Sequence, residues 1–322
     1  KDLFSSHCRL SLESSPEPDE AEIQGLADRV NSYLEDGIKG PIHINIPIQE
    51  PFYSGEYYAP SQEPRQFVTG DALMLLDLDD YIRVPNKPLK VLVMNGMEDG
   101  QLLVVQCSDE RSYDRLVVLS DITSNQSSSI PHWDAMLYTL MRNDPDRAAA
   151  LCPDILVTTG TATVSKGLKQ LFQANKPIKH YHISRHKEVG DPFGTSPERL
   201  DPYSPSKPGK ALQIDENYQL LWQKFSVNYL QQMIQLNWSD WNEFTAVKSV
   251  LTALPAGQIL HLANSTSVRY GSFLVDELGD MQLMSNRGTS GIDGCTSTAV
   301  GTAILTDKDV YLISGDLAML YD

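Results

Sequence analysis

Residues Leu89–Asn95 read Leu-Lys-Val-Leu-Val-Met-Asn, and residues Ile155–Thr159 read Ile-Leu-Val-Thr-Thr. Short apolar runs of this kind are typical of strands that are covered on both faces of a sheet. Two further runs, Arg115–Ser120 and Lys179–Ser184, predict strands as well. Helical patterns alternate with these strands at Gly70–Tyr81, Glu98–Cys107, Trp133–Leu140 and Thr163–Ala174. This alternation predicts an α/β fold with a doubly wound parallel sheet.

The same alternation continues toward the carboxyl end of the chain. Residues Asp191–Lys210 hold five prolines and predict a long loop. Two long helices are predicted after it, at Glu216–Leu236 and Glu243–Leu254. Strands are then predicted at Gln258–Ala263, Met281–Met284 and Val310–Ser314, separated by helices at Ser267–Leu278 and Asp293–Leu305. A doubly wound sheet normally has about five or six strands, so we expect this second sheet to be truncated.

The amino-terminal part begins with a polar stretch and then predicts a helix at Glu20–Glu35. The alternation of apolar and polar residues in Pro41–Pro47 predicts a strand. Residues 51–66 have the proline-rich composition of a linker. We expect segments at 1–59, 60–225 and 226–322. Because the chain starts at Lys1 and stops just after a strand, we also expect it to be part of a longer protein.

The composition limits the kinds of partner. The 322 residues include 26 Lys and Arg against 42 Asp and Glu, a net charge of −16. Such a surface repels phosphate backbones and anionic lipids, so we expect neither nucleic acid nor a membrane as partner. The four cysteines lie far apart, which argues against a disulfide framework and favours a cytoplasmic protein. Because cations are scarce, an arginine at a strand end points to a small anionic ligand.

The first polar strand end is Asn264-Ser265, with Arg269 one turn into the following helix. In open parallel sheets, ligands bind beyond the carboxyl ends of the strands. An amide, a hydroxyl and a guanidinium at that place suit a carboxylate ligand. The alternative is that Ser265 merely caps the helix and Arg269 is solvated.

The other two strand ends are also unusual. Residues 285–294 read Ser-Asn-Arg-Gly-Thr-Ser-Gly-Ile-Asp-Gly, and their three glycines allow a ligand to approach the backbone closely. The small residues of the following helix leave room for a phosphate or cofactor at its start. The third strand end, Gly315-Asp316, offers a carboxylate of the kind that Mg²⁺ prefers. An ordinary loop connection is the alternative at both places.

Two other groups of residues are expected not to form sites. His180, His182 and His186 resemble a metal cluster, but the first two share one face of a strand and no carboxylate has ligand spacing. The acidic run Asp77–Asp80 is expected to be a solvated helix end.

Taken in order, the three strand ends resemble a known family. The strings Asn-Ser-x-x-x-Arg at 264–269, Asn-Arg-Gly-x-Ser-Gly-Ile-Asp-Gly at 286–294 and Ser-Gly-Asp-Leu-Ala at 314–318 resemble the 2-succinyl-5-enolpyruvyl-6-hydroxy-3-cyclohexene-1-carboxylate synthases. These are thiamine-diphosphate-dependent transferases of menaquinone biosynthesis. The string Gly-Pro-Ile-His-Ile-Asn-Ile-Pro at 40–47 resembles the wider superfamily. The resemblance begins near residue 20 and is weaker between residues 60 and 250.

The resemblance implies an architecture and a reaction. The three segments would be the tail of a pyrimidine-binding domain, a complete central domain and the front half of a diphosphate-binding domain. The family decarboxylates 2-oxoglutarate on thiamine diphosphate, with Mg²⁺ or Mn²⁺, and adds the resulting carbanion to isochorismate. The family also implies a homodimer or homotetramer. Its catalytic Glu is expected before residue 1, so no catalytic residue is assigned and the chain alone is expected to be inactive.

The resemblance also implies residue roles. Substrate contacts are implied for Asn264, Ser265, Arg269, Arg287 and Lys166, with the two arginines on substrate carboxylates. Cofactor contacts are implied for Ile292, Gly315 and Asp316, of which Asp316 also binds the metal ion. For Lys166, an exposed helix lysine is the alternative.

Two other functions fit the same sequence. One is a related thiamine-diphosphate decarboxylase of the acetolactate-synthase or phenylpyruvate-decarboxylase type, although the arginine pair favours a dicarboxylic 2-oxo acid. The other is a non-catalytic module whose central sheet binds a nucleotide or effector, without the G-x-G-x-x-G signature.

Overall fold

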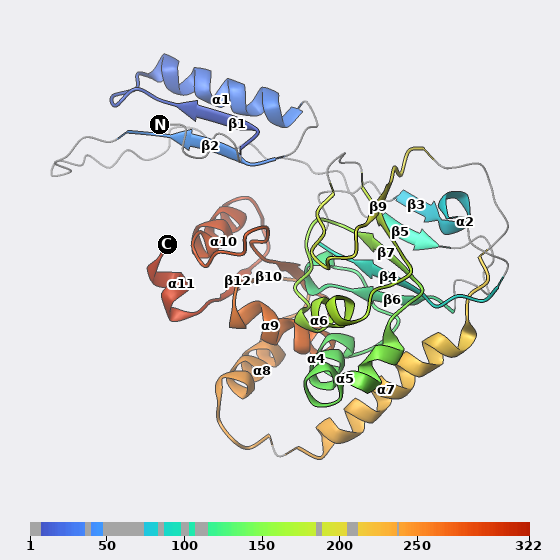
Figure 1. Ribbon diagram of the computed structural model, residues 1–322. Coiled ribbons are helices and arrows are strands. Elements are labelled where there is room, and N and C mark those ends of the chain that lie inside the picture. The colour runs from blue at the N-terminus through green and yellow to red at the C-terminus, as the bar shows by residue number, and fades with distance from the viewer. Residues whose placement is uncertain are drawn as a thin grey trace. The chain divides into compact units, whose positions relative to one another are not determined.

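The computed structural model describes residues 8–35, 40–47, 74–82, 87–97, 103–106, 115–184, 189–204, 212–236 and 238–322. Two compact units divide the chain, Lys1–Glu63 and Pro64–Asp322. In the first unit, strands β1 (Leu10–Glu13) and β2 (Ile42–Asn45) pair in parallel, and helix α1 (Glu20–Glu35) connects them (Figure 1). The sequence predicted α1 and β2 but not β1, because Leu-Ser-Leu-Glu is too short and too polar to stand out. The predicted linker at 51–66 lies outside the described residues.

The second unit contains a five-stranded parallel sheet in the order β6-β4-β7-β8-β9. Four of its strands lie where the sequence predicts them: β4 (Val91–Asn95), β6 (Val117–Ser120), β7 (Ile155–Thr159) and β8 (Lys179–Ile183). The fifth, β9 (Glu198–Leu200), falls in the stretch predicted as loop. It pairs with β8 at the edge of the sheet, where a short polar strand is tolerated and leaves no apolar pattern in the sequence.

Two predicted helices are wrong. Among the described residues of the first, Met74–Asp77 forms strand β3 and Leu78–Tyr81 is helical, as α2. Leu103–Gln106, inside the second, forms strand β5, which pairs in parallel with β3. Four-residue apolar runs do not distinguish a strand from a helix by periodicity. Here the pairing of the two runs with each other overrides their local preference.

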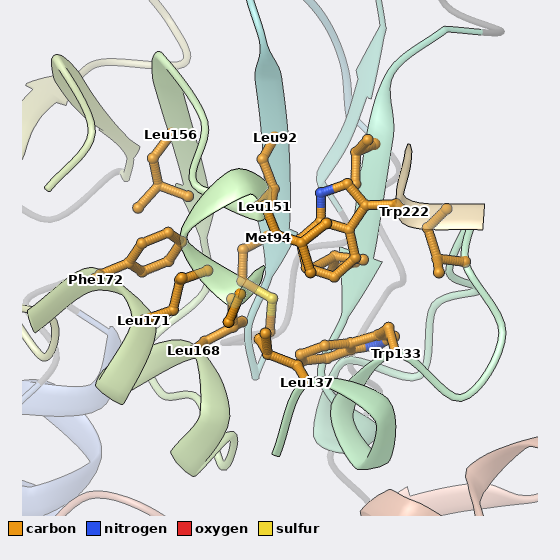
Figure 2. Packing of buried hydrophobic residues seen from close by; sticks show 14 of the residues in the cluster. Leu92, Met94, Trp133, Leu137, Leu151, Leu156, Leu168, Leu171, Phe172 and Trp222 are labelled. Atoms are coloured by element: carbon orange, nitrogen blue, oxygen red, sulfur yellow. The ribbon is translucent and has the colours of Figure 1, made fainter. Parts of the chain in front are cut away.

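Helices cover the five-stranded sheet and close its core. Helices α4 (Trp133–Asn143) and α6 (Lys166–Ala174) lie where the sequence predicts helices, α5 (Pro145–Ala148) follows α4, and α7 (Glu216–Ile234) is the first long helix. Figure 2 shows the resulting cluster, which holds Trp222 of α7 together with Trp133, Leu137 and the sheet residues Leu92 and Met94. Tyr218 is also buried there and donates a hydrogen bond to the Leu151 carbonyl at 2.7 Å. Helix α7 therefore packs on the five-stranded sheet.

A second parallel sheet, of three strands, lies in the same unit. Strand β10 (Ile259–Leu262) is central, and β11 (Gln282–Met284) and β12 (Val310–Ile313) flank it. Helices α8 (Glu243–Ala253), α9 (Thr266–Phe273), α10 (Cys295–Ile304) and α11 (Asp316–Leu320) accompany these strands. The predicted strands and helices of this part are confirmed to within a few residues. No helix in the described parts of the chain is both long and apolar enough to cross a bilayer.

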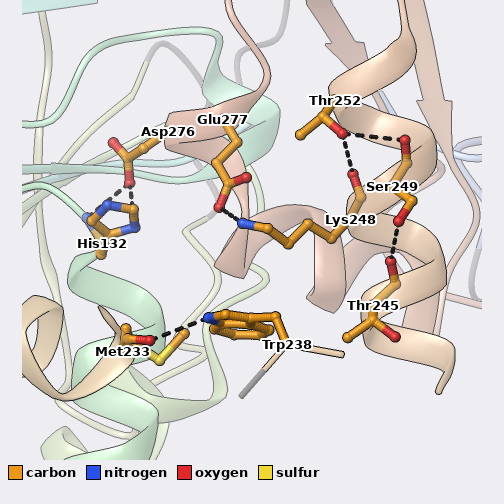
Figure 3. Close-up of polar contacts among 9 residues, drawn as sticks. All are labelled: His132, Met233, Trp238, Thr245, Lys248, Ser249, Thr252, Asp276 and Glu277. Carbon is orange, nitrogen blue, oxygen red and sulfur yellow. Dashed lines mark hydrogen bonds and ion pairs between the residues drawn. The ribbon is translucent and has the colours of Figure 1, made fainter. Parts of the chain in front are cut away.

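Polar side chains join the two sheets. The Asn125 amide, just after β6, exchanges hydrogen bonds with the backbone of Leu283 in β11 at 3.0 and 2.7 Å. The buried Asp134 carboxylate of α4 accepts from Ser165 and from Ser272 of α9, each at 2.5 Å. Figure 3 shows a third connection, from His132 to Asp276. These contacts connect the carboxyl-terminal sheet to the five-stranded sheet.

We expect Asp134→Asn to stabilise the protein at neutral pH. Burial raises the pKa of Asp134 to about 6. Ionised Asp134 therefore lowers the free energy of unfolding, with full effect above pH 6. The loss shrinks as the pH falls from 6 toward 3.8, the ordinary pKa of an Asp side chain, because the folded protein then keeps the carboxyl protonated. The gain should be about 1–3 kcal/mol at pH 7 and near zero at pH 4 in urea unfolding. The control Asp146→Asn removes an exposed charge of α5 and should shift stability little at either pH. An unchanged pH profile in Asp134→Asn would contradict the expectation.

Candidate functional site

The three polar strand ends of the carboxyl-terminal sheet meet at one edge. A small apolar cluster joins Ala263 after β10, Ile292 and Cys295 after β11, and Ala318 after β12. Because the three strands are parallel and β10 is central, their carboxyl ends share this edge. The structure therefore brings together the segments that the sequence singled out.

Asn264 organises this edge. Its side chain is buried, and its amide nitrogen donates to the carbonyls of Asn286 and Gly291, both at 2.6 Å. Its amide oxygen accepts from Nη1 of Arg287, also at 2.6 Å. Both polar atoms are thus engaged by the loop that follows β11. The substrate contact that the sequence predicts for Asn264 stays a prediction, and in the structure the side chain of Asn264 positions Arg287.

Ser265 has a backbone conformation that is rare for a residue with a side chain. Its φ is 74° and its ψ is −121°, at the junction of β10 and α9. It occupies the cap position of α9 but makes no capping hydrogen bond, so the alternative of a Ser cap is wrong. The side chain is exposed. Strain of this kind gathers at functional sites, where the surrounding structure enforces it.

The positive charge of Arg269 affects the pKa of Arg287. Arg269 is exposed on α9, and Arg287 is half-buried in the loop after β11. Burial lowers the pKa of Arg287, the Asp121 carboxylate opposes this shift, and the charge of Arg269 adds to it. The Nε atom of Arg287 is buried and has no hydrogen-bond partner in the described structure. A buried cationic donor without a partner is costly, and an anionic ligand would relieve that cost.

The loop after β11 has the backbone that its glycines predict. Gly288 and Gly294 have φ values of +111° and +73°, which disfavour side chains. Ile292, half-buried, packs against the small cluster at the strand ends. Gly294 caps α10, and the Ser285 hydroxyl at the start of the loop is buried without a described partner. The loop therefore has glycines that let a ligand approach its backbone, and a buried hydroxyl without a described hydrogen-bond partner.

Gly315 and Asp316 follow β12. Gly315 is the cap residue of α11, and Asp316 is the first residue of that helix, with an exposed side chain. Within the described residues, no group of three His, Cys, Asp or Glu could hold a metal ion. The described structure thus offers Asp316 as a single carboxylate beside the glycine-rich loop.

The sequence missed two residues near the arginines. Asp121 follows β6 in the other sheet, is buried, and accepts from the backbone N–H of Val164 at 2.6 Å. Lys169, in the first turns of α6, is half-buried, and its pKa is lowered first by burial and then by Arg287. Neither belongs to a strand end of the carboxyl-terminal sheet, so no local pattern links them to it. Lys166, which the resemblance implies, is exposed at the first position of α6.

The histidines of β8 contact threonines. His180 uses both ring nitrogens, with Thr158 at 2.8 Å and Thr195 at 2.7 Å, and burial lowers its pKa to about 4. His182 contacts Thr158 as well, at 2.8 Å, and His186 lies outside the described residues.

The acidic run Asp77–Asp80 is not simply solvated. Asp77 caps α2, and Asp79 is buried and accepts from the Leu212 backbone N–H at 2.6 Å. The prediction of a solvated helix end is therefore wrong for Asp79, because a later segment of the chain covers it.

These features define a class: a parallel α/β protein that gathers cations and a glycine-rich loop at the carboxyl edge of one sheet. No family model matches the chain. It is, however, 31% identical to a 2-succinyl-5-enolpyruvyl-6-hydroxy-3-cyclohexene-1-carboxylate synthase of Cytophaga hutchinsonii, over 100% of this chain and 59% of the relative. Synthases of the same name from Bacteroides thetaiotaomicron and Flavobacterium psychrophilum are 32% and 29% identical, over 88% and 100% of this chain. The predicted resemblance to these synthases is confirmed.

The chain spans only part of these relatives. It covers 59% of the length of the Cytophaga hutchinsonii protein and 51% of the Bacteroides thetaiotaomicron protein.

We expect Asn264→Ala to release the loop after β11. The substitution removes three hydrogen bonds and leaves the Asn286 and Gly291 carbonyls without their described donor. The free energy of unfolding should fall by about 2–3 kcal/mol. Trypsin should cleave after Arg287 several times faster than in the wild type, as followed by mass spectrometry. Asn143→Ala, an exposed control on α4, should change neither measurement. Unchanged cleavage in Asn264→Ala would show that other contacts hold the loop.

Proposed function

We propose that the chain is part of a thiamine-diphosphate-dependent transferase of menaquinone biosynthesis. The reaction is the loss of CO₂ from 2-oxoglutarate and the joining of the remaining four-carbon unit to isochorismate. The product is the one that the relatives' name states, 2-succinyl-5-enolpyruvyl-6-hydroxy-3-cyclohexene-1-carboxylate. The observation that carries the proposal is the pair of arginines at adjacent strand ends of an acidic chain, within a sequence similar to those synthases. Both substrates are organic acids, and guanidinium groups bind carboxylates in a defined geometry.

The residues at the sheet edge fit the diphosphate end of this cofactor. Gly288 and Gly294 keep the loop backbone accessible, and Ser285 has a buried hydroxyl without a described partner. Ile292 would give apolar support to the cofactor, and Asp316, next to Gly315, would supply one oxygen to Mg²⁺ or Mn²⁺. When bound, thiamine diphosphate supplies the nucleophilic carbon and the electron sink for decarboxylation. This chain's own residues would bind and orient the acids.

The arginines would act on the substrates as follows. Asn264 fixes the guanidinium of Arg287 through its amide oxygen, so that the remaining donors of Arg287 have a set direction. Arg269 lies on α9, and its charge acts on Arg287. A substrate carboxylate held by both would be oriented before reaction, which lowers the entropic part of the barrier. Ser265, with its strained backbone and exposed hydroxyl, would add a hydrogen-bond donor at the same edge.

We also propose that the complete enzyme works in the cytoplasm as a homodimer or homotetramer. The substrate contacts proposed for this chain include Lys166 at the start of α6. A related decarboxylase of the acetolactate-synthase type would accept pyruvate, whereas two arginines favour a second carboxylate on the 2-oxo acid. Substrate competition distinguishes the two enzymes.

The test uses the full-length protein with thiamine diphosphate and Mg²⁺. We expect it to consume isochorismate and 2-oxoglutarate together and to release CO₂, with pyruvate as a poor competitor. A folded protein that leaves both acids unchanged would contradict the proposal.

We expect Arg287→Ala to reduce kcat/KM for one of the two acids by about 10- to 100-fold. The reason is that a charge-assisted hydrogen bond contributes about 1.5–3 kcal/mol. Arg142→Ala removes an exposed charge from the last turn of α4 and serves as the matched control. Equal losses in the two variants would mean that net charge, not a contact by Arg287, accounts for the effect.

A further inference from the structure

The position of Arg269 depends on the helix that carries it. Its side chain is exposed, and within the described parts of the chain it forms no ion pair with a carboxylate. Helix α9 is short, Thr266–Phe273, and its first half follows directly from the strained Ser265. The contacts that hold α9 in place come from its second half, where residues 271–273 meet the helices and turns of the other sheet.

The most specific of these contacts is the hydrogen bond between Ser272 and Asp134. Both residues are buried, and the Ser272 hydroxyl donates to Oδ2 of Asp134 at 2.5 Å. The other carboxylate oxygen, Oδ1, accepts from the hydroxyl of Ser165, the cap residue of α6. Ser272 lies three residues after Arg269, within one helical turn. Asp134 therefore holds the turn of α9 that carries Arg269, and it holds that turn against α4 and α6.

The backbone of α9 also lies close to its neighbours. A Cβ atom at position 271 would be 2.5 Å from Cδ1 of Leu262 in β10 and 3.1 Å from Cδ1 of Ile122, which follows β6. A side chain larger than that of glycine would therefore displace the helix from both. Gly271 thus lets α9 approach the residues of the two sheets at the position beside Ser272.

The first turns of α4 make two further contacts in the same region. The Tyr138 ring lies 5.4 Å from the ring of Phe273, the last residue of α9. The backbone N–H of His132 donates to the Asp276 carboxylate at 2.8 Å, three residues after α9 ends (Figure 3). One helix of the five-stranded sheet therefore holds α9 and the segment that follows it.

Asp134 is an expensive way to make this contact. Burial raises its pKa to about 6, so the carboxylate is ionised at neutral pH at a cost in stability. Within the described residues, no cationic side chain forms an ion pair with it. An apolar contact between α4 and α9 would avoid this cost, but it would lack the fixed direction of a hydrogen bond. A costly, directional contact is the kind that a functional site retains.

We propose that Asp134 is a positioning residue that, through its hydrogen bond to Ser272, fixes helix α9 and thereby directs Arg269 toward the carboxylate of an acidic substrate. The identity of the acid rests on the proposed function. The hold of Asp134 on α9 does not depend on it.

The kinetic test compares two variants of the full-length protein that each lose one buried hydroxyl. Ser272→Ala should raise KM for one of the two acids by about three- to tenfold, with kcat changed less, because Arg269 loses its set direction. Tyr218→Phe removes the hydrogen bond to the Leu151 carbonyl in the core of the five-stranded sheet and serves as the matched control. It should lower the urea midpoint and leave both KM values near the wild type. Wild-type KM values in Ser272→Ala would overturn the proposal.

A double-mutant cycle with Arg269 distinguishes positioning from a general weakening of the fold. Arg269→Ala alone should raise KM for the same acid. If Ser272 acts through Arg269, then Ser272→Ala should add little in the Arg269→Ala background. Two effects that multiply would mean that Ser272 acts independently of Arg269, and the proposal would be overturned.

Substitutions of Asp134 itself separate the hydrogen bonds from the rest of the side chain. Asp134→Ala should behave like Ser272→Ala. Asp134→Asn should recover most of the affinity, because an amide of the same shape can accept from one hydroxyl and donate to the other. If Asp134→Ala does not fold, Ser272→Ala decides. No recovery in a folded Asp134→Asn would overturn the proposal.

Amide hydrogen exchange gives a readout that is independent of turnover. In the full-length protein, peptides that cover 266–273 should exchange several times faster in Ser272→Ala than in the wild type, because α9 opens more often. The same peptides should exchange at the wild-type rate in Tyr218→Phe. Unchanged exchange of α9 in Ser272→Ala would show that Asp134 does not hold the helix, and it would overturn the proposal.

The tests also separate this proposal from the proposed reaction. If the wild type shows no turnover but α9 exchanges faster in Ser272→Ala, the reaction fails and the hold of Asp134 on α9 stands. If the wild type turns over and Ser272→Ala behaves like Tyr218→Phe, the reaction stands and the role of Asp134 fails. If Arg269→Ala leaves both KM values unchanged, Arg269 binds neither acid and the proposal is overturned.

Discussion

The carboxamide of Asn264 is the interaction on which the candidate site depends. It is buried at the end of the central strand β10, and its three hydrogen bonds all reach the loop after β11. An asparagine satisfies two carbonyls and one guanidinium because it has both donors and an acceptor. A carboxylate at this position could not donate, and an apolar residue could do neither. The direction of Arg287 therefore follows from a residue at the end of a different strand.

A second constraint acts between the two sheets. Asp134 and Asp121 are both buried, and both accept hydrogen bonds from the segment around Val164 and Ser165. Burial raises the pKa of both carboxylates, so both are costly to ionise at neutral pH. Asp134 joins the start of α6 to α9 through these hydrogen bonds. Some stability is thus given up at the junction between the two sheets.

The sequence predicted the features that depend on local pattern. Most strands of the two larger sheets are rich in apolar residues, and the ends of the carboxyl-terminal strands carry the unusual polar residues, so both could be found without coordinates. Strands β3, β5 and β9 were missed because each is only three or four residues long and is defined by its partner strand. The strain at Ser265 was also invisible, since a serine after a strand normally suggests a helix cap.

The candidate site was predictable only in part, for a reason that Lys169 illustrates. The charge of Arg287 acts on it across 118 positions of sequence, and α6 and α9 are joined through hydrogen bonds of Asp134 in α4. Motifs report residues that lie on one strand end, whereas a substrate contacts residues from every element that packs around it. Cations that lie close together repel one another, and tertiary contacts must offset that repulsion. Asp134 is one such contact, because it binds α9, the helix that carries Arg269, although no sequence motif includes Asp134.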